Sequence, residues 1–257
     1  MTRWDDIQYL RFSDERTRAA RELLARVPLE QADQVVDLGC GPGNSTALLH
    51  ARWPRARIRG VDNSAEMLRS ARQALPALEW IQADLADPAG WQADTPVDLL
   101  FANAVLHWLP DHATLLPRLL GMLRPGGVLA LQMPSNDHEP SHRLMRELPG
   151  PWQARLQQVG GRTAVLPAAF YYDVLAPHAA RVDLWQTTYE QVMPDPAAIV
   201  EWVKGSGLRP YLEALRDDAE RSEFLAAYTA AIDAAYPART DGRRLFTFPR
   251  VFVVAVR

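Results

Sequence analysis

The sequence of 257 residues predicts a doubly wound α/β fold with a mostly parallel sheet and helical lid insertions. Two observations carry this prediction. Short apolar runs alternate with helical patterns through the first half of the chain, which is typical of βαβ units. A glycine-rich turn follows the first apolar run, and acidic residues lie at or near the ends of the first three runs.

The first half of the chain contains the clearest strand patterns, over residues 34–38, 57–61, 78–83, 97–102 and 128–133. Helices are expected over 46–53 and 112–123, and Ser64 is a candidate N-cap for another. From about residue 135 to 180 the pattern is irregular and helical. A strand over 182–191, helices over 197–203 and 216–236 and a last strand over 245–256 complete the chain, with Pro249 marking a bulge or an edge.

These patterns predict one domain over 1–257 that is built in layers. Residues 1–30 would contain a lid helix, and residues 31–134 would form a cofactor-binding core. Two helical insertions, over 135–180 and 195–240, would form a substrate cap. A minimal cofactor domain needs fewer residues than this chain has, so the surplus is where a substrate pocket would be built.

Composition excludes several classes of protein. The chain has one cysteine, Cys40, so neither an intrachain disulfide nor a cysteine-based zinc site is expected. A net charge of −3 without a basic block argues against nucleic-acid binding. The longest aliphatic stretch is too short to span a bilayer, and the charged start is unlike a signal peptide. We therefore expect a cytoplasmic protein without a nucleic-acid or membrane partner, and favour a monomer.

The glycine loop is the most informative stretch. Gly39, Gly41 and Gly43 follow the first predicted strand with the spacing G-x-G-x-G, whereas the dinucleotide fingerprint requires a glycine where Asn44 stands. Asp37 precedes the first glycine by two residues. A carboxylate there suits a ligand with a cationic amine and would repel a pyrophosphate.

Two further acids follow the next strands. Asp62 ends the second strand, 23 residues after Gly39, where an acid can accept both ribose hydroxyls. Asp84 follows the third strand, where a carboxylate can accept a hydrogen bond from an adenine amino group. The three acids would line one crevice, and they imply an adenosine that carries positive charge and no phosphate.

These motifs resemble those of the class I S-adenosylmethionine-dependent methyltransferases. The resemblance implies a Rossmann-like seven-stranded sheet with the last strand antiparallel, and S-adenosylmethionine as cofactor with S-adenosylhomocysteine as product. By this resemblance, the cofactor-binding residues are Tyr9, Phe12, Arg16, Asp37, Gly39, Gly41, Gly43, Asp62, Asn63, Met67, Asp84, Leu85 and Asn103.

A closer resemblance is to members of this family that esterify trans-aconitate. It is carried by motifs spread over nearly the whole chain, among them 36–50, 101–104, 108–112, 207–210 and 248–250. It implies methyl transfer to one carboxylate oxygen of this tricarboxylate, giving a monomethyl ester. Because carboxyl groups are ionised near pH 7, no general base is required. His107 stands where we would have expected glutamine.

The spectator carboxylates of such a substrate need cationic and hydroxyl partners. The substrate-binding candidates are Tyr171, Tyr172, Arg209 and Arg250, and His107 and Trp108 are candidates for positioning. Each also has a structural interpretation: one of the adjacent tyrosines would be core, Arg209 a solvated helix end and Arg250 an edge-strand charge. No metal site is expected, because the histidines at 112, 138 and 142 fit solvated loops better than a metal motif.

Other functions remain open at this point. The same cofactor could serve another small-molecule or carrier-bound carboxylate. A nicotinamide oxidoreductase is disfavoured by Asn44, and a nucleic-acid methyltransferase by the lack of a base-clamping motif at 103–106. A non-catalytic binding module would be expected to have lost part of the glycine loop or the ribose acid, and both are present.

Overall fold

The computed structural model describes residues 13–87, 90–159, 165–205 and 207–257. The chain divides into two compact units. The core unit comprises the described residues within 13–134, 163–187 and 251–257, and the helical unit comprises those within 135–162 and 188–250.

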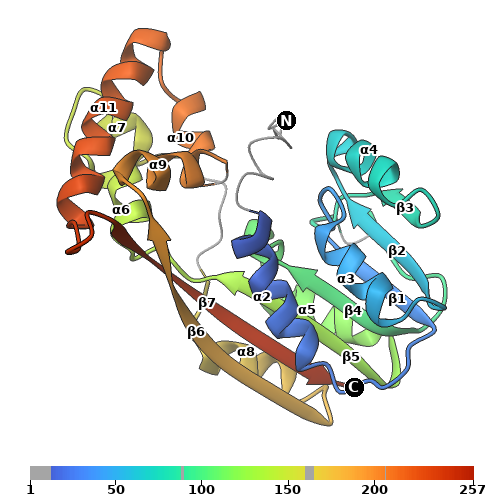
Figure 1. The fold of residues 1–257 in the computed structure, drawn as a ribbon. Helices are drawn as coiled ribbons and strands as arrows, with labels where there is room; N and C mark the ends of the chain where they lie inside the picture. Colours follow the sequence, from blue (N-terminus) through green and yellow to red (C-terminus); the bar gives the residue numbers. More distant parts are fainter. Residues whose placement is uncertain (1–12, 88–89, 160–164, 206) are drawn as a thin grey trace. The chain divides into compact units, whose positions relative to one another are not determined.

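Within the described residues, seven strands form one sheet in the order β3-β2-β1-β4-β5-β7-β6 (Figure 1). The pairs β1–β2, β2–β3, β1–β4 and β4–β5 are parallel. The strand order reverses between β1 and β4, which is the switch point where doubly wound sheets bind ligands. The bounds are β1 Gln34–Leu38, β2 Arg57–Asp62, β3 Glu79–Gln82, β4 Val97–Asn103, β5 Leu123–Pro134, β6 Arg181–Met193 and β7 Arg244–Val256.

The last strand, β7, runs antiparallel to both of its neighbours. Arg257 exchanges backbone hydrogen bonds with the start of β5, at Gly126 and Gly127, while Ser135 just past the end of β5 donates to Pro249. On the other side, Ala180 before β6 donates to Val256, and Thr247 donates to Glu190 near the end of β6. The predicted mixed sheet with an antiparallel last strand is confirmed.

Helices cover both faces of the sheet in the core unit. In Figure 1, α2 and α3 lie on one face and α5 and α8 on the other, and each pair is in contact. None of the described helices is long and apolar enough to cross a membrane. The core-unit helices are α2 Ser13–Ala25, α3 Asn44–Arg52, α4 Ala65–Ala74, the 3₁₀ turn η1 Leu106–Trp108, α5 His112–Gly121 and α8 Ala168–Leu175.

The helical unit has a core of aromatic rings. Trp202 packs against Phe246 and Phe248, and Trp152 packs edge-on against Phe224. The buried carboxylate of Glu220 binds Arg155 and Arg216, which ties α7 to α11. The helices of this unit are α6 Pro140–Glu147, α7 Gln153–Leu156, α9 Pro196–Lys204, α10 Arg209–Glu213 and α11 Asp218–Ala235.

Local capping explains several helix starts. Ser64 accepts a hydrogen bond from the backbone of Met67, as predicted, and Asp111 does the same for Thr114. Asp195 and Asp217 cap α9 and α11 in the same way. Each cap satisfies one of the backbone N–H groups that a helix start leaves without a partner.

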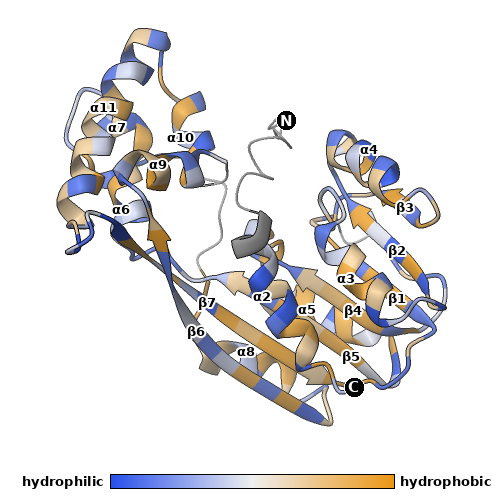
Figure 2. Ribbon diagram, viewed as in Figure 1, coloured by the Kyte–Doolittle hydropathy of each residue, from blue (hydrophilic) through white to orange (hydrophobic). Residues whose placement is uncertain are grey.

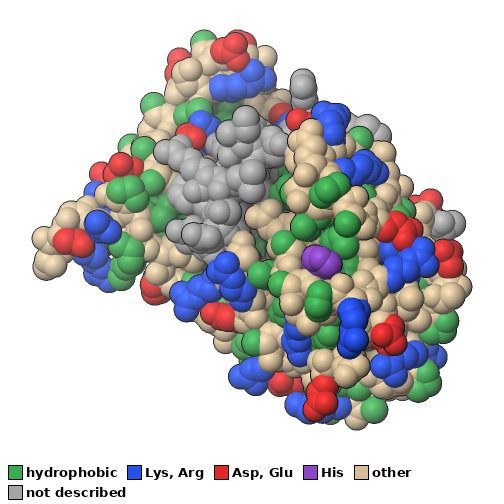
Figure 3. All heavy atoms as spheres, turned by 45° about the vertical axis from the view of Figure 1, so that its right-hand side comes forward, with side chains coloured by type: hydrophobic (Ala, Val, Ile, Leu, Met, Phe, Trp, Pro, Cys, Tyr) green, Lys and Arg blue, Asp and Glu red, His purple; other side chains and the backbone are tan. Residues whose placement is uncertain are grey.

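Burial follows the position of each strand in the sheet. The central strands β1 and β4 are almost wholly buried, and each is apolar except for one internal aspartate, Asp37 or Asp98, and one polar end residue. The outer strand β6 alternates hydrophilic and hydrophobic residues (Figure 2). On the face seen in Figure 3, acidic and basic side chains are interspersed and form no single-sign field.

The structure differs from the sequence-based expectations in two places. Strand β5 begins at Leu123, because the Pro-Gly-Gly segment is held in the sheet by Arg257. The predicted insertion over 135–180 is divided, since α8 packs against α5 in the core unit. Of the predicted lid over residues 1–30, the structure describes α2, which packs on α3 and β5, and the lid itself stays a prediction.

Asp98 provides a test of what holds the amino end of the sheet together. Its carboxylate accepts hydrogen bonds from the backbone N–H groups of Asp33 and Gln34, both at 2.7 Å, and from Arg124. Burial alone would raise the pKa of Asp98, but these hydrogen bonds outweigh burial and lower it. Asp98→Asn should reduce the free energy of unfolding by about 1–3 kcal/mol, because an amide N–H would face those donors.

Urea denaturation measures this change. The difference from wild type should shrink as the pH falls through the lowered pKa of Asp98, where the wild-type carboxyl is also neutral. The exposed Asp94, just before β4, is the control, and Asp94→Asn should change stability by less than about 0.5 kcal/mol. Equal midpoints for Asp98→Asn and wild type would contradict the assigned role.

Candidate functional site

The carboxyl ends of four neighbouring strands bring the predicted cofactor residues to one edge of the core unit. Asp37 pairs in register with Gly60, and Asp62 pairs with Gln82. On the other side of β1, Leu38 pairs with Ala102. The glycine loop after β1, Asp62 at the end of β2 and the turn after β4 therefore start from the same edge of the sheet.

The glycine loop is anchored to β2 by backbone hydrogen bonds. The N–H groups of Gly39 and Cys40 both donate to the carbonyl of Val61, at 2.7 and 3.1 Å. Gly39 has a φ of 63°, and a Cβ there would lie 2.2 Å from the Cγ2 atom of Val105. Glycine is therefore required at this position both by the left-handed backbone and by the contact with Val105.

Gly41 is left-handed as well, with a φ of 54°, but its surroundings differ. A Cβ at Gly41 would meet no atom within 4 Å. Its N–H donates to Asp62 at 2.9 Å, which holds the middle of the loop against the end of β2. The backbone at Gly41 is therefore open to the close approach of a ligand.

Asp37 is fully buried beneath this loop. Its Oδ2 atom accepts hydrogen bonds from the hydroxyls of Ser45 at 2.7 Å and Thr46 at 2.6 Å. Its Oδ1 atom is also buried and has no hydrogen-bond partner among the described residues. Burial raises the pKa of Asp37 to about 7, against the two hydroxyls, which lower it. A buried carboxylate oxygen without a partner fits the cationic amine that the sequence implies.

Asp62 is held by two backbone groups. Its Oδ1 atom accepts from Ser64 N–H at 2.8 Å, and its Oδ2 atom accepts from Gly41 N–H. Burial raises the pKa of Asp62, while these hydrogen bonds lower it. Each carboxylate oxygen can accept a further hydrogen bond, so the group is oriented and still able to bind hydroxyls.

The adenine-side candidates differ in exposure. Asp84 is exposed, and its Oδ1 atom accepts from the N–H of Ala86. Leu85 is buried in the hydrophobic core. Met67 is buried and Asn63 is exposed, so of these two only Asn63 presents its side chain to solvent.

The remaining cofactor candidates are Asn103, at the end of β4, and three residues near the start of the chain. Asn103 at the end of β4 accepts a hydrogen bond from Gln132 at 2.6 Å, which fixes the orientation of its amide. Tyr9 and Phe12 lie outside the described residues. Arg16 lies in α2, and only its helical backbone is described.

Cys40 is a buried spacer in the loop. It packs with Leu68, Ala71 and Trp80, and burial raises the pKa of its thiol. A thiol held neutral in an apolar cluster is a poor nucleophile. The cysteine therefore contributes volume to the packing of the loop on α4 and β3.

The turn after β4 carries the two positioning candidates. His107 and Trp108 both lie in η1, with ring centroids 5.0 Å apart. His107 is buried and Trp108 is partly buried. Their turn starts from the same edge of the sheet as the glycine loop, so they remain candidates for the rim of the site.

The adjacent tyrosines on α8 have different roles. Tyr171 is fully buried, its hydroxyl accepts from Leu166 N–H at 3.1 Å, and it lies 3.2 Å from Nδ1 of His112. Burial raises the pKa of Tyr171. Because its hydroxyl serves the core, the structure does not present Tyr171 to a substrate. Tyr172 is 52% exposed and remains the candidate of this pair.

The arginine candidates lie in the helical unit. Arg250 is 5% exposed, and its guanidinium carbon lies 4.8 Å from the ring centroid of Phe248 and 6.0 Å from that of Tyr189. Arg209, at the start of α10, pairs with Glu213 at 2.9 Å. The buried, ring-stacked Arg250 is thus the better preorganised cation of the two.

The prediction of solvated histidines was wrong for two of the three. His112 and His142 are buried, the first against Tyr171 and the second beside Ser141, and only His138 is exposed. In the part of the chain that the structure describes, no three His, Cys, Asp or Glu side chains are grouped as a metal site would require.

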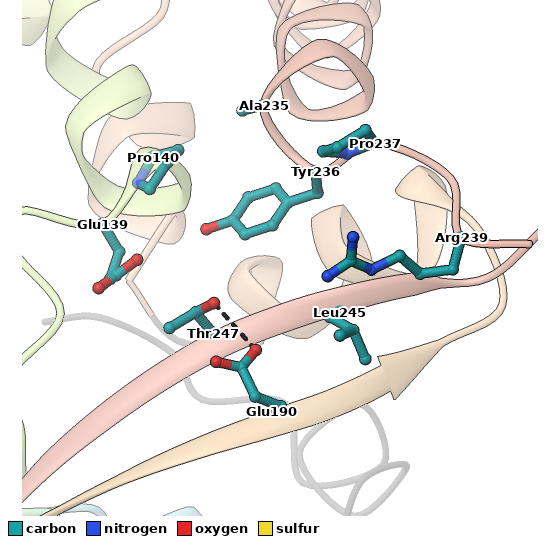
Figure 4. A pocket seen from close by; sticks show the side chains of 9 residues that line it. All are labelled: Glu139, Pro140, Glu190, Ala235, Tyr236, Pro237, Arg239, Leu245 and Thr247. Carbon is teal, nitrogen blue, oxygen red and sulfur yellow. Dashed lines mark hydrogen bonds between the residues drawn. The ribbon is translucent and has the colours of Figure 1, made fainter.

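A cavity of about 420 Å³ lies in the helical unit between the start of α6, the end of α11 and the strands β6 and β7 (Figure 4). Its lining includes Glu139, Glu190 and Arg239. Burial and the neighbouring Glu190 raise the pKa of Glu139. Two carboxylates in one cavity repel a polyanion, so this cavity is a poor site for a tricarboxylate.

Comparison with known proteins agrees with the fold and the loop. Residues 35–127 match the family described as "Methyltransferase domain". Among solved structures, the YcgJ protein from Bacillus subtilis has a TM-score of 0.58 at 12% identity, covering 93% of this chain and 98% of that chain. The fold and the site place the protein in the class I methyltransferases.

Curated relatives match the chain from end to end. The trans-aconitate 2-methyltransferase of Azoarcus sp. strain BH72 is 71% identical over 260 residues, covering 100% of both chains. The enzyme of the same name from Methylobacterium radiotolerans is 59% identical, covering 99% of this chain and 98% of its own. The chain belongs to the trans-aconitate 2-methyltransferase family.

Sequence reasoning missed three residues that shape the site. Ser45 and Thr46 orient Asp37, and Val105 packs directly on Gly39. The two hydroxyls could have been found, because they follow the acid by eight and nine residues, across one strand-turn-helix unit. Val105 could not, because its contact depends on the pairing of β1 with β4.

The raised pKa of Asp37 predicts an unusual pH dependence of stability. The folded ligand-free protein keeps this proton up to about pH 7, whereas the unfolded chain loses it near 3.8. Stability therefore falls as the pH rises between these values, by about 2–3 kcal/mol from about pH 5 to about pH 8. Asp37→Asn should remove this loss.

The measurement is urea denaturation of wild type and Asp37→Asn at both pH values. The variant should gain stability relative to wild type as the pH rises, while Asp94→Asn shows no such trend. A constant difference between wild type and Asp37→Asn would mean that Asp37 is already ionised at about pH 5.

Proposed function

We propose that the protein transfers a methyl group from S-adenosylmethionine to a carboxylate oxygen of trans-aconitate, giving a monomethyl ester. The observation that carries this proposal is the similarity over the whole chain to enzymes of that name, which extends through the helical unit. Substrate specificity is expected there, because the core unit supplies the residues that every member of the wider class needs.

The core unit would hold the cofactor. Bound S-adenosylmethionine supplies an electrophilic methyl group on a sulfonium. Asp37 would accept a hydrogen bond from its amine, directly or through water, using the buried oxygen that has no partner among the residues that the structure describes. Asp62 would bind the ribose hydroxyls, and the open backbone at Gly41 would border the methionine end.

No general base is needed in this proposal. The carboxylate nucleophile is ionised near pH 7, so an oxygen–carbon bond forms as the carbon–sulfur bond breaks, and no proton moves. The residues of the site have to align oxygen, methyl and sulfur and to exclude water. His107 would then act in packing or positioning.

Arg250 is our first candidate for binding the spectator carboxylates. A buried guanidinium stacked on Phe248 is held in one orientation, and its planar fork suits a carboxylate. Arg209, Tyr172 and Trp108 are further candidates. Arg209 would have to exchange Glu213 for the substrate.

A second acceptor remains an alternative within the same chemistry. Another small-molecule or carrier-bound carboxylate would use the same cofactor residues and the same buried cation. Labelled methyl transfer to a panel of di- and tricarboxylates, with a base-labile ester as product, decides between them. Labelling of trans-aconitate well above the other acids is expected, and preference for another acid would overturn the substrate assignment.

Ligand-induced stabilisation tests the cofactor. S-adenosylhomocysteine at about 100 times its Kd should raise the Tm by roughly 5–10 °C, and NAD should not. Asp62→Ala should reduce the shift to less than about 2 °C, because two hydrogen bonds to a charged acceptor are lost.

Glu79→Ala is the matched control for this experiment. Glu79 is an exposed acid on the neighbouring strand β3, paired with Arg57, and its removal should leave the shift unchanged. A shift with NAD alone would refute the cofactor assignment, and a full shift in Asp62→Ala would place the ribose elsewhere.

Substitution of Arg250 tests the substrate site. Arg250→Met keeps an apolar stem on Phe248 and removes the charge, so the KM for trans-aconitate should rise at least about thirtyfold. The Kd for S-adenosylhomocysteine should stay within about twofold. Steady-state kinetics and calorimetry measure the two constants.

Arg244→Met is the control on the same strand. Arg244 pairs with Asp233, outside the predicted substrate site, so its loss should leave the KM within about twofold. If Arg250→Met weakens only the cofactor, the proposed position of the substrate is wrong.

A further inference from the structure

A buried chain of hydrogen bonds in the core unit links α8 to the turn after β4. The N–H of Leu166 donates to the Tyr171 hydroxyl at 3.1 Å, which lies 3.2 Å from Nδ1 of His112. Nε2 of His112 lies 2.8 Å from the carbonyl oxygen of Leu106. His112 is 3% exposed and Tyr171 is fully buried.

The partners of this chain fix the direction of each hydrogen bond. The carbonyl of Leu106 can only accept, so Nε2 of His112 carries a proton and donates it. In the neutral ring Nδ1 then accepts, and the Tyr171 hydroxyl donates to it while accepting from Leu166. Every group in the chain is satisfied with one tautomer of His112.

The anchored carbonyl belongs to a turn that is held in an unusual conformation. Ala104 and Asp111, on either side of η1, have φ values of 56° and 52°. Such left-handed non-glycine residues persist where the surroundings hold them. Ala104 donates to Gln132, and Asp111 caps α5, so the bond from His112 secures the middle of the turn.

The same turn packs against the glycine loop. Val105 precedes Leu106, and its Cγ2 atom would lie 2.2 Å from a Cβ on Gly39. A displaced Leu106 carbonyl would carry Val105 with it, either into the glycine loop or away from it. The position of Leu106 is therefore coupled to the shape of the loop by direct contact.

We propose that His112 and Tyr171 are a positioning pair that holds the turn at residues 104–108 against the glycine loop, and that the affinity of the site for the adenosyl ligand depends on this pair. The proposal rests on the proposed function only for the identity of that ligand. Neither residue is proposed to touch it.

The tautomer of His112 is the first test, and it requires no ligand and no substitution of the pair. Nitrogen-15 spectra of the histidine rings in the full chain should show a proton on Nε2 of His112. A ring protonated at Nδ1 instead would overturn the hydrogen-bond chain.

The second test is the affinity for S-adenosylhomocysteine, measured by calorimetry. Tyr171→Phe deletes one hydroxyl and should raise the Kd roughly fivefold. Asp98→Asn is the control, because Asp98 serves another buried hydrogen-bond network at the opposite end of the sheet. It should lower the Tm and leave the Kd within about twofold. Equal Kd values for Tyr171→Phe and wild type would overturn the proposal.

Rescue by a conservative variant separates hydrogen bonding from packing at position 112. Glutamine can donate to the Leu106 carbonyl and leucine cannot, so His112→Gln should bind S-adenosylhomocysteine more tightly than His112→Leu. Equal affinities would contradict the role of the donor. If wild type binds this ligand without methylating trans-aconitate, the substrate assignment fails and the positioning pair stands.

Discussion

The buried carboxylate of Asp37 is the constraint around which the cofactor edge is organised. Asp37 lies near the end of β1, in the middle of the sheet, and both hydroxyls that satisfy it come from the start of α3. The glycine loop must therefore turn tightly enough to bring that helix back over the strand. The left-handed glycines make this turn possible, and Val61 and Asp62 on β2 hold it from the side.

This arrangement destabilises the ligand-free protein locally. One oxygen of Asp37 is buried without a partner in the described part of the chain, and burial raises the pKa of this carboxyl to about 7. The buried apolar residues of β1 and β4 offset that cost. A buried carboxylate oxygen that lacks a partner in the ligand-free protein favours the binding of a cation. The carboxylate has already lost its water in the folded state, so binding does not have to remove it.

Local patterns predicted the central sheet well, and non-local contacts limited the rest. Strand 34–38 was predicted at its observed bounds, since a buried parallel strand is an apolar run ended by glycine. Local patterns could not show that α8 packs on α5 in the core unit, because nearly 50 residues separate the end of α5 from the start of α8. Adjacent residues on a helix point in different directions, so the sequence could say that one of Tyr171 and Tyr172 is core, but not which.

The prediction that His112 and His142 are solvated was wrong for a related reason. Pro140 stands at the start of α6, where proline is tolerated, and His142 is buried in that first turn. His112 follows the N-cap of α5 and bonds to a hydroxyl 59 residues away. A polar residue near a helix start can be solvated or can secure a turn, and only the tertiary partner distinguishes the two.

The residues proposed to bind the two reactants differ in charge between the two units. In the proposal, the core unit would offer the buried Asp37 and the half-buried Asp62 to a cationic ligand, whereas the helical unit holds the buried cation Arg250 on aromatic rings. Methyl transfer from a sulfonium to a carboxylate neutralises one charge of each sign, so under the proposed function the acids would bind the cationic reactant and Arg250 the anionic one. Under the proposed function, a change of acceptor would alter residues within 135–162 and 188–250 and leave the glycine loop and its acids as they are.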